Sequence, residues 1–143
     1  KNLLGAENLL KKLGGLFKRE KKLRDVGLYK DCAEEFVEAK MFLEFIKSEN
    51  VDFKSKIEFA FDDYLGGISD LTGEILRKAV QVATQGKFEE LPAYKKAMEQ
   101  VLGELIKFDF TGKLRMKYDA AKRNLKRMEE IMYDIKIKKL TNE

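Results

Sequence analysis

The sequence contains no histidine and no tryptophan, and it has one cysteine and one proline among 143 residues. Without histidine, the chain cannot form a Ser-His-Asp triad, a Cys-His pair, a histidine-ligated haem or a His-rich zinc site. A single cysteine cannot form an internal disulfide bond, which fits a reducing compartment, and a cytoplasmic location is expected. Any catalysis by this chain must therefore use carboxylates, hydroxyls, lysines or a metal ion.

Long hydrophobic runs are also missing. No apolar run approaches the roughly 18 residues that a membrane-spanning helix needs, and no signal-peptide pattern is present. No membrane partner is therefore expected. With 44% hydrophobic and 38% charged residues, the chain has the composition of a globular protein, and its length predicts a single domain over residues 1–143.

Apolar residues recur at helical spacing through most of the chain, and no strand pattern of comparable length competes. Pro92 stands where a first-turn proline would open a helix. Gln85-Gly86 and Thr111-Gly112 are expected to end helices and turn the chain. The pattern predicts an all-α fold, an antiparallel helix bundle with short loops, with helices over about residues 3–16, 28–47, 55–61, 64–83, 92–107 and 114–135.

Charge is unevenly distributed along the chain. The total of +4 divides into +6 over residues 1–30, −8 over residues 31–74 and +6 over residues 75–143. Within residues 113–127 there are seven basic residues and one acidic residue, Asp119. Basic stretches of this kind can neutralise phosphates of a nucleic acid, although each is equally compatible with a solvated helix face.

The acidic middle block contains two carboxylate pairs at helical spacing. Glu35 and Glu38 lie three residues apart on one predicted helix, and Asp70 and Glu74 lie four apart on the next. If the two helices are neighbours, the four carboxylates can converge, and such a cluster requires a counter-charge. Oxygen ligands without histidine or cysteine favour a hard cation, Mg²⁺ or alternatively Mn²⁺.

A simpler interpretation of these acids remains open at this point. Acidic residues at such spacing are common on exposed helix faces, where Glu74 could pair with Lys78, and Glu34 or Glu35 with Lys40. Three glycines (Gly66, Gly67 and Gly73) favour the metal interpretation. Glycine lowers helix stability, so its use here suggests that another element approaches closely.

Several motifs resemble the translin family, and they are closer to translin-associated factor X (TRAX), of the archaeal type, than to translin itself. The resemblance covers residues 28–139, while residues 1–27 match poorly, and we expect the family's first long helix to be absent. It rests on EFVEA at 35–39, DYLGGISDLTGEILR at 63–77, QGKF at 85–88, KYD at 117–119, KRMEE at 126–130 and YDI at 133–135.

The resemblance implies an all-α bundle of the translin type that assembles into a closed homo-oligomer, typically an octameric shell. Members of the family bind single-stranded RNA and DNA and, in some cases, short duplexes. TRAX-type subunits are Mg²⁺-dependent endoribonucleases, whereas translin subunits mainly bind and scaffold. The resemblance therefore leaves two functions: a metal-dependent endoribonuclease acting on single-stranded or nicked short RNA, or a non-catalytic RNA- and DNA-binding scaffold subunit.

Residue roles follow from the same resemblance. The catalytic acids of TRAX fall on Glu35, Glu38 and Asp70, and Glu74 completes the set that would hold Mg²⁺ and so activate a water for phosphodiester hydrolysis. The basic stretch that the family uses for nucleic acids precedes the first acidic pair. Here it corresponds to Lys22, Arg24 and Lys30.

Overall fold

A computed structural model of the chain describes residues 2–17, 27–51 and 60–141, and within these ranges it contains helices and connecting turns but no strand. The expected all-α fold is confirmed. The α-helices are α1 (Asn2–Phe17), α2 (Gly27–Ser48), α3 (Phe61–Thr84), α4 (Leu91–Leu105) and α5 (Gly112–Thr141). A short 3-10 helix, η2 (Phe88–Glu90), directly precedes α4. Most of the short helix expected over residues 55–61 lies outside the described ranges.

Helix ends follow the local sequence. Gly86, directly after α3, has a φ of +78°, a left-handed conformation that glycine adopts without strain. Gly112 has a φ of +56° where the chain turns into α5. Pro92 lies in the first turn of α4, where its missing N–H is not required by the helix. These residues act as the sequence predicts. None of the described helices combines the length and apolar character that a bilayer crossing demands.

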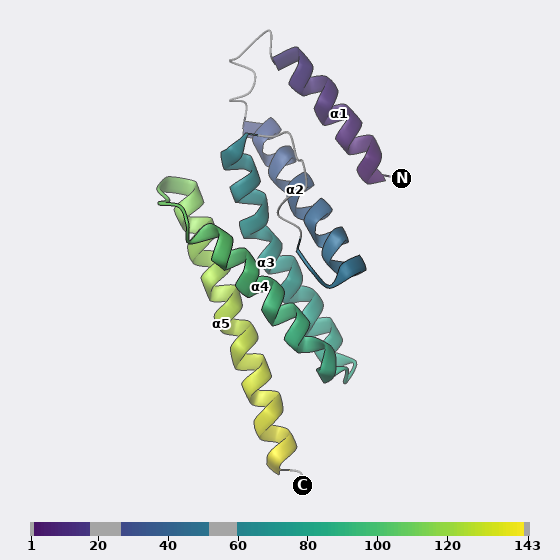
Figure 1. Cartoon of the computed structure of the whole chain (residues 1–143), viewed down its shortest axis with the longest axis vertical. Helices are drawn as coiled ribbons and strands as arrows, with labels where there is room; N and C mark the ends of the chain where they lie inside the picture. The colour runs from purple at the N-terminus through teal and green to yellow at the C-terminus, as the bar shows by residue number, and fades with distance from the viewer. Residues whose placement is uncertain (1, 18–26, 52–59, 142–143) are drawn as a thin grey trace.

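α3 is the central helix of the bundle and packs against α2, α4 and α5, while α1 lies on the outer side of α2 (Figure 1). The core forms along α3 because its apolar residues recur every three or four positions. Leu71, Ile75 and Ala79 are fully buried in α3. They pack in one cluster with Met41 and Phe45 from α2, Met98, Val101 and Leu105 from α4, and Ala121 and Met128 from α5.

The helix directions differ in one respect from the predicted antiparallel bundle. α4 runs antiparallel to α3 and α5, as expected for helices joined by short turns (Figure 1). α2, however, runs parallel to α3: Glu34 lies against Gly66, Val37 against Gly67, and Glu38 beside Asp70. Helical periodicity specifies which face of α2 is buried but not the direction of the helix. The parallel arrangement brings the two acidic pairs to the same level of the bundle.

Two adjacent glycines let α2 and α3 approach closely. A Cβ atom on Gly67 would lie 2.6 Å from both the Glu34 carbonyl oxygen and the Val37 Cβ, and a Cβ on Gly66 would lie 2.5 Å from Glu34 Oε1. At Gly67 a larger residue would push the helices apart, whereas at Gly66 it would displace the side chain of Glu34. The expected close approach is confirmed at Gly66 and Gly67, but not at Gly73, whose Cβ would have ordinary room.

Replacing Gly67 with alanine is expected to lower the free energy of unfolding by about 1–3 kcal/mol, because the new methyl group overlaps the α2 backbone. Gly73→Ala is the matched control in the same helix, since its Cβ would be 3.7 Å from Asn124 Nδ2. Better helix propensity should make the control more stable by up to about 1 kcal/mol. Urea unfolding followed by circular dichroism measures both changes. Equal effects of the two substitutions would contradict the tight contact.

Candidate functional site

The structure brings the two predicted acidic pairs together on adjacent faces of α2 and α3. The negative charges of Asp70, Glu74 and Glu35 all act on the carboxyl group of Glu38. Glu38 and Asp70 are partly buried, and Glu35 is exposed. This proximity follows from the parallel packing of the helices. Glu34 lies against Gly66, so Glu38, four residues further along α2, lies beside Asp70, four residues further along α3.

A groove of about 930 Å³ lies beside these carboxylates, between α2, α3 and the first turn of α1. Its wall combines acidic, basic and apolar side chains. The acidic residues are Glu35, Glu38 and Glu74, and the remaining lining residues are Leu3, Ala39, Phe42, Leu43, Ile46, Arg77, Lys78 and Gln81. The acidic cluster is therefore accessible from an open groove that also offers apolar contact surface.

Burial, together with the nearby negative charges of Asp70 and Glu74, raises the pKa of Glu38 from 4.5 to about 7, against the opposing charge of Lys117. Its carboxyl group forms no hydrogen bond or ion pair with the described residues. A carboxylate that is both desolvated and surrounded by other carboxylates is poorly neutralised. The cluster thus carries more negative charge than the protein itself compensates.

The two acids from α3 each contact a basic side chain. Asp70 accepts a hydrogen bond from the Lys117 ammonium group of α5, and Glu74 accepts one from the Arg77 guanidinium group one turn along α3. Arg77 is largely exposed, so its pair with Glu74 contributes little to stability. Lys117 is only 17% exposed, so its pair with Asp70 lies in a less solvated environment.

Lys117 is part of a longer chain of ion pairs that links α2, α5 and α3. Its Nζ atom lies 3.0 Å from Glu34 Oε2, and Lys113 Nζ lies 3.2 Å from the same oxygen. Lys113 also lies 3.0 Å from Asp31 Oδ1. Acidic and basic groups alternate along this chain, which ends at Asp70. The carboxyl group of Glu34, although buried, is therefore neutralised from two sides.

Sequence reasoning missed the roles of Glu34 and Lys117. Helical spacing predicts Glu34 as an exposed partner of Lys40, yet it is 7% exposed. A signal was available, because Glu34 lies on the same stripe as the buried Val37 and Met41, and a glutamate there requires a cation. Lys117 was counted as one of the phosphate-neutralising residues in 113–127, and nothing in that count separates it from its exposed neighbours.

The donor chemistry of the cluster fits a hard divalent cation, since all available ligand atoms are oxygens and Glu38 lacks a partner. The present side-chain arrangement does not yet form such a site. Across residues 2–17, 27–51 and 60–141, no group of three or more Asp, Glu or Cys side chains is placed to hold a metal ion. Asp70 and Glu74 instead contact Lys117 and Arg77.

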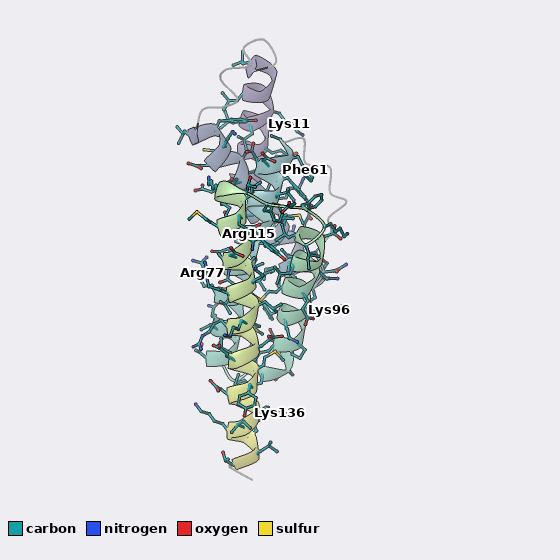
Figure 2. The ribbon with its side chains drawn as sticks, turned by 90° about the vertical axis from the view of Figure 1, so that its left-hand side faces the viewer. Lys11, Phe61, Arg77, Lys96, Arg115 and Lys136 are labelled. Carbon is teal, nitrogen blue, oxygen red and sulfur yellow. The ribbon has the colours of Figure 1, made fainter. Side chains whose placement is uncertain are left out.

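Of the predicted nucleic-acid-binding residues, Lys22 and Arg24 lie outside the described residues. Lys30 lies in the first turn of α2, where its charge opposes the rise in the pKa of Asp63 that burial causes. The other basic stretch lies on α5, which runs along the front of the bundle in Figure 2, between the labelled Arg115 and Lys136. Arg123 and Lys126 on this helix are exposed.

Comparison with protein families and curated proteins gives one match. The model of the Translin family matches residues 7–139. The match includes residues 7–27, which the quoted motifs had placed outside the resemblance, so α1 contains residues that align with the family. None of the curated proteins matches the chain.

Solved structures with the same fold include AfC3PO, whose crystal structure is 28% identical with a TM-score of 0.84, over 96% of this chain and 74% of that one. The crystal structure of apo-NeC3PO is 25% identical, with a TM-score of 0.78, over 89% of this chain and 68% of that one. A structure of AfC3PO in complex with duplex RNA matches with 27% identity and a TM-score of 0.74, over 94% of this chain and 75% of that one.

The raised pKa of Glu38 predicts that stability depends on pH in metal-free protein. Because the folded-state pKa, about 7, lies above the ordinary value of 4.5, the folded chain retains a proton that the unfolded chain has released. The stability that this group contributes is therefore present below pH 4.5 and is lost as the pH rises through 7.

Glu38→Gln mimics the protonated form and should remove this loss. We expect it to raise the free energy of unfolding at about pH 8 by about 1–2 kcal/mol, a value reduced for solvent screening of a partly exposed carboxyl group. Thermal unfolding in EDTA across this pH range measures the effect, with the exposed Glu89→Gln as control. Identical pH profiles for Glu38→Gln and the unsubstituted chain would argue against the raised pKa.

Proposed function

This chain belongs to the Translin family, and from that premise we propose that it binds RNA as a homo-oligomer and cleaves it with a divalent cation. The observation that carries the proposal is the convergence of Glu35, Glu38, Asp70 and Glu74 beside a groove that the three glutamates line, with Glu38 inadequately neutralised. The RNA complex of the similar AfC3PO supports RNA as the ligand.

The four carboxylates would hold Mg²⁺ or Mn²⁺ through oxygen atoms, with Glu35, Glu38 and Asp70 as the catalytic acids and Glu74 as their companion. Such a cation supplies a water of lowered pKa and neutralises charge on a phosphate. The chain's own residues orient the site: the parallel packing of α2 and α3 places Glu38 beside Asp70, and an open groove leads to the carboxylates. No histidine base is needed, which agrees with the composition.

The exposed basic residues of α5 are the proposed contact for the RNA backbone. Arg123 and Lys126 lie three residues apart on one face of α5 and make no ion pair with the described residues. Contacts of this kind bind phosphates without reading base sequence, so single-stranded DNA is a second possible ligand. Lys22, Arg24 and Lys30 remain predicted nucleic-acid contacts, and Lys22 and Arg24 lie outside the described residues.

Exposed apolar side chains support assembly of several copies, for which a closed octameric shell is the family-based expectation. The C-terminal part of α5 projects beyond the ends of α3 and α4 (Figure 1). Tyr133, Ile137 and Leu140 form an exposed stripe there, at helical spacing. Such patches on a soluble protein mark contact surfaces.

A second candidate function is a scaffold subunit that binds RNA or DNA without cleaving it. The observation that favours it is the pairing of Asp70 with Lys117 and of Glu74 with Arg77, which leaves no ready-made metal geometry among the described residues. A scaffold would use the same basic surface of α5 and would gain nothing from a divalent cation.

Cleavage of a labelled single-stranded RNA separates the two functions. We expect Mg²⁺-dependent cleavage that stops in EDTA and falls by about 100-fold or more in Asp70→Asn, because the substitution removes a charged ligand. Asp109→Asn, in the exposed loop before α5, is the matched control and should retain full activity. Full activity of Asp70→Asn, or RNA binding without any cleavage, would reject the nuclease and favour the scaffold.

The α5 surface predicts a salt-dependent affinity for RNA. Replacing Arg123 and Lys126 together with glutamine should weaken binding and reduce the slope of log K against log salt by about 1.4, at about 0.7 per phosphate contact on a single strand. The control removes two exposed lysines elsewhere, in Lys87→Gln/Lys96→Gln; Figure 2 shows Lys96 on the side of α5 opposite Arg77. Fluorescence anisotropy at several salt concentrations measures both. Equal slopes for the two double variants would exclude α5 as the contact.

A further inference from the structure

Lys117 differs from the other basic residues of α5 in its surroundings. Its side chain is 17% exposed, whereas that of Lys113, one turn earlier, is 60% exposed. Two carboxyl groups from different helices face its ammonium group: Glu34 from α2 and Asp70 from α3. Burial lowers the pKa of Lys117, but the hydrogen bonds to Asp70 and Glu34 outweigh that effect and raise it, so the side chain is a cation.

Glu34 fixes the position of this cation. The carboxyl group of Glu34 lies over Gly66, where a Cβ atom would be 2.5 Å from its Oε1 atom, and the residue is only 7% exposed. Its second oxygen accepts the contacts from Lys113 and Lys117, at 3.2 and 3.0 Å. Asp70, by contrast, is partly exposed and lies next to the acidic cluster. Lys117 is therefore anchored on one side and neutralises the cluster on the other.

We propose that Lys117 is the internal counter-cation of the acidic cluster: it holds Asp70 in the metal-free protein and lowers the affinity of the cluster for a divalent cation. The inference rests on the proposed metal site and concerns how that site is regulated. It also accounts for the absence of a formed metal geometry among the described residues, because Asp70 is directed to an ammonium group.

The physical basis is competition between like charges. A divalent cation that uses Asp70 must take this ligand from Lys117 and must bind close to an ammonium group that Glu34 retains. At separations of a few ångströms in a partly buried site, the repulsion between two such cations is a substantial part of the binding free energy. Lys117 is thus a positioning residue: it acts through Asp70 and determines when that carboxylate is available.

The test measures Mn²⁺ binding to the whole chain without RNA, by the loss of the free Mn²⁺ signal in electron paramagnetic resonance. Lys117→Met should bind Mn²⁺ about tenfold more tightly or better, since the competing charge is gone. Lys113→Met is the matched control: it removes the same charge one turn away but has no contact with Asp70, and its affinity should change by less than about threefold. Lys117→Arg, which keeps the charge, should resemble the unsubstituted chain.

A second measurement uses no metal. In EDTA, Lys117→Met should lower the melting temperature less in the Asp70→Asn background than in the unsubstituted chain, because the ion pair is already broken there. If Lys117→Met fails to fold, Glu34→Gln/Lys117→Met replaces it, with Glu34→Gln as its control, because this pair leaves no buried carboxylate without its cation.

The outcomes separate this inference from the proposed function. Mn²⁺ binding by the unsubstituted chain that is not tightened in Lys117→Met overturns the role of Lys117 and leaves the nuclease proposal intact. Equal tightening in Lys113→Met also overturns it, since general charge would then explain the effect. No Mn²⁺ binding by either chain overturns the metal site and, with it, the inference. Additive melting temperatures in EDTA overturn the contact between Lys117 and Asp70.

Discussion

The close contact of α2 and α3 at Gly66 and Gly67 is the constraint on which the rest of the structure depends. With no Cβ atoms at these positions, the backbone of α2 at Glu34 and the side chain of Val37 pack directly on α3. Glu38 and Asp70 follow about one turn later on their helices, so the distance between these two acids is set by this contact. A wider spacing would place Glu38 in solvent, and its carboxyl group would lose the environment that raises its pKa.

The same contact creates a requirement for positive charge. Close packing buries Glu34 and partly buries Glu38, and a buried carboxylate is stable only if a cation or a proton neutralises it. For Glu34 the protein supplies Lys113 and Lys117 from α5. For Glu38 it supplies no direct partner among the described residues, and the raised pKa expresses that deficit. The chain therefore neutralises Glu34 with its own lysines and leaves Glu38 to be neutralised by a proton or a bound cation.

Much of the fold followed from the sequence because it depends on local patterns. Helical periodicity, Pro92 and Gly86 predict most helix ends within a few residues, although α5 continues to Thr141, beyond the predicted end at 135. The glycine pair in DYLGG indicates the close approach. The proximity of the two acidic pairs was also predicted. The parallel direction of α2 was not, since periodicity is the same in both directions. Nor was the function of Lys117, because a lysine in a basic stretch acquires its role only from carboxylates on distant segments.

α5 connects the acidic cluster with the exposed apolar stripe at the C-terminal end of the helix. It is one continuous helix of 30 residues, about 45 Å long, with Lys117 near its start and the Tyr133 stripe near its end. If copies of the chain meet through the Tyr133 stripe, a turn of α5 at that contact also shifts the ammonium group beside Asp70. Subunit assembly and cation affinity would then be thermodynamically linked, each altering the other by the same factor.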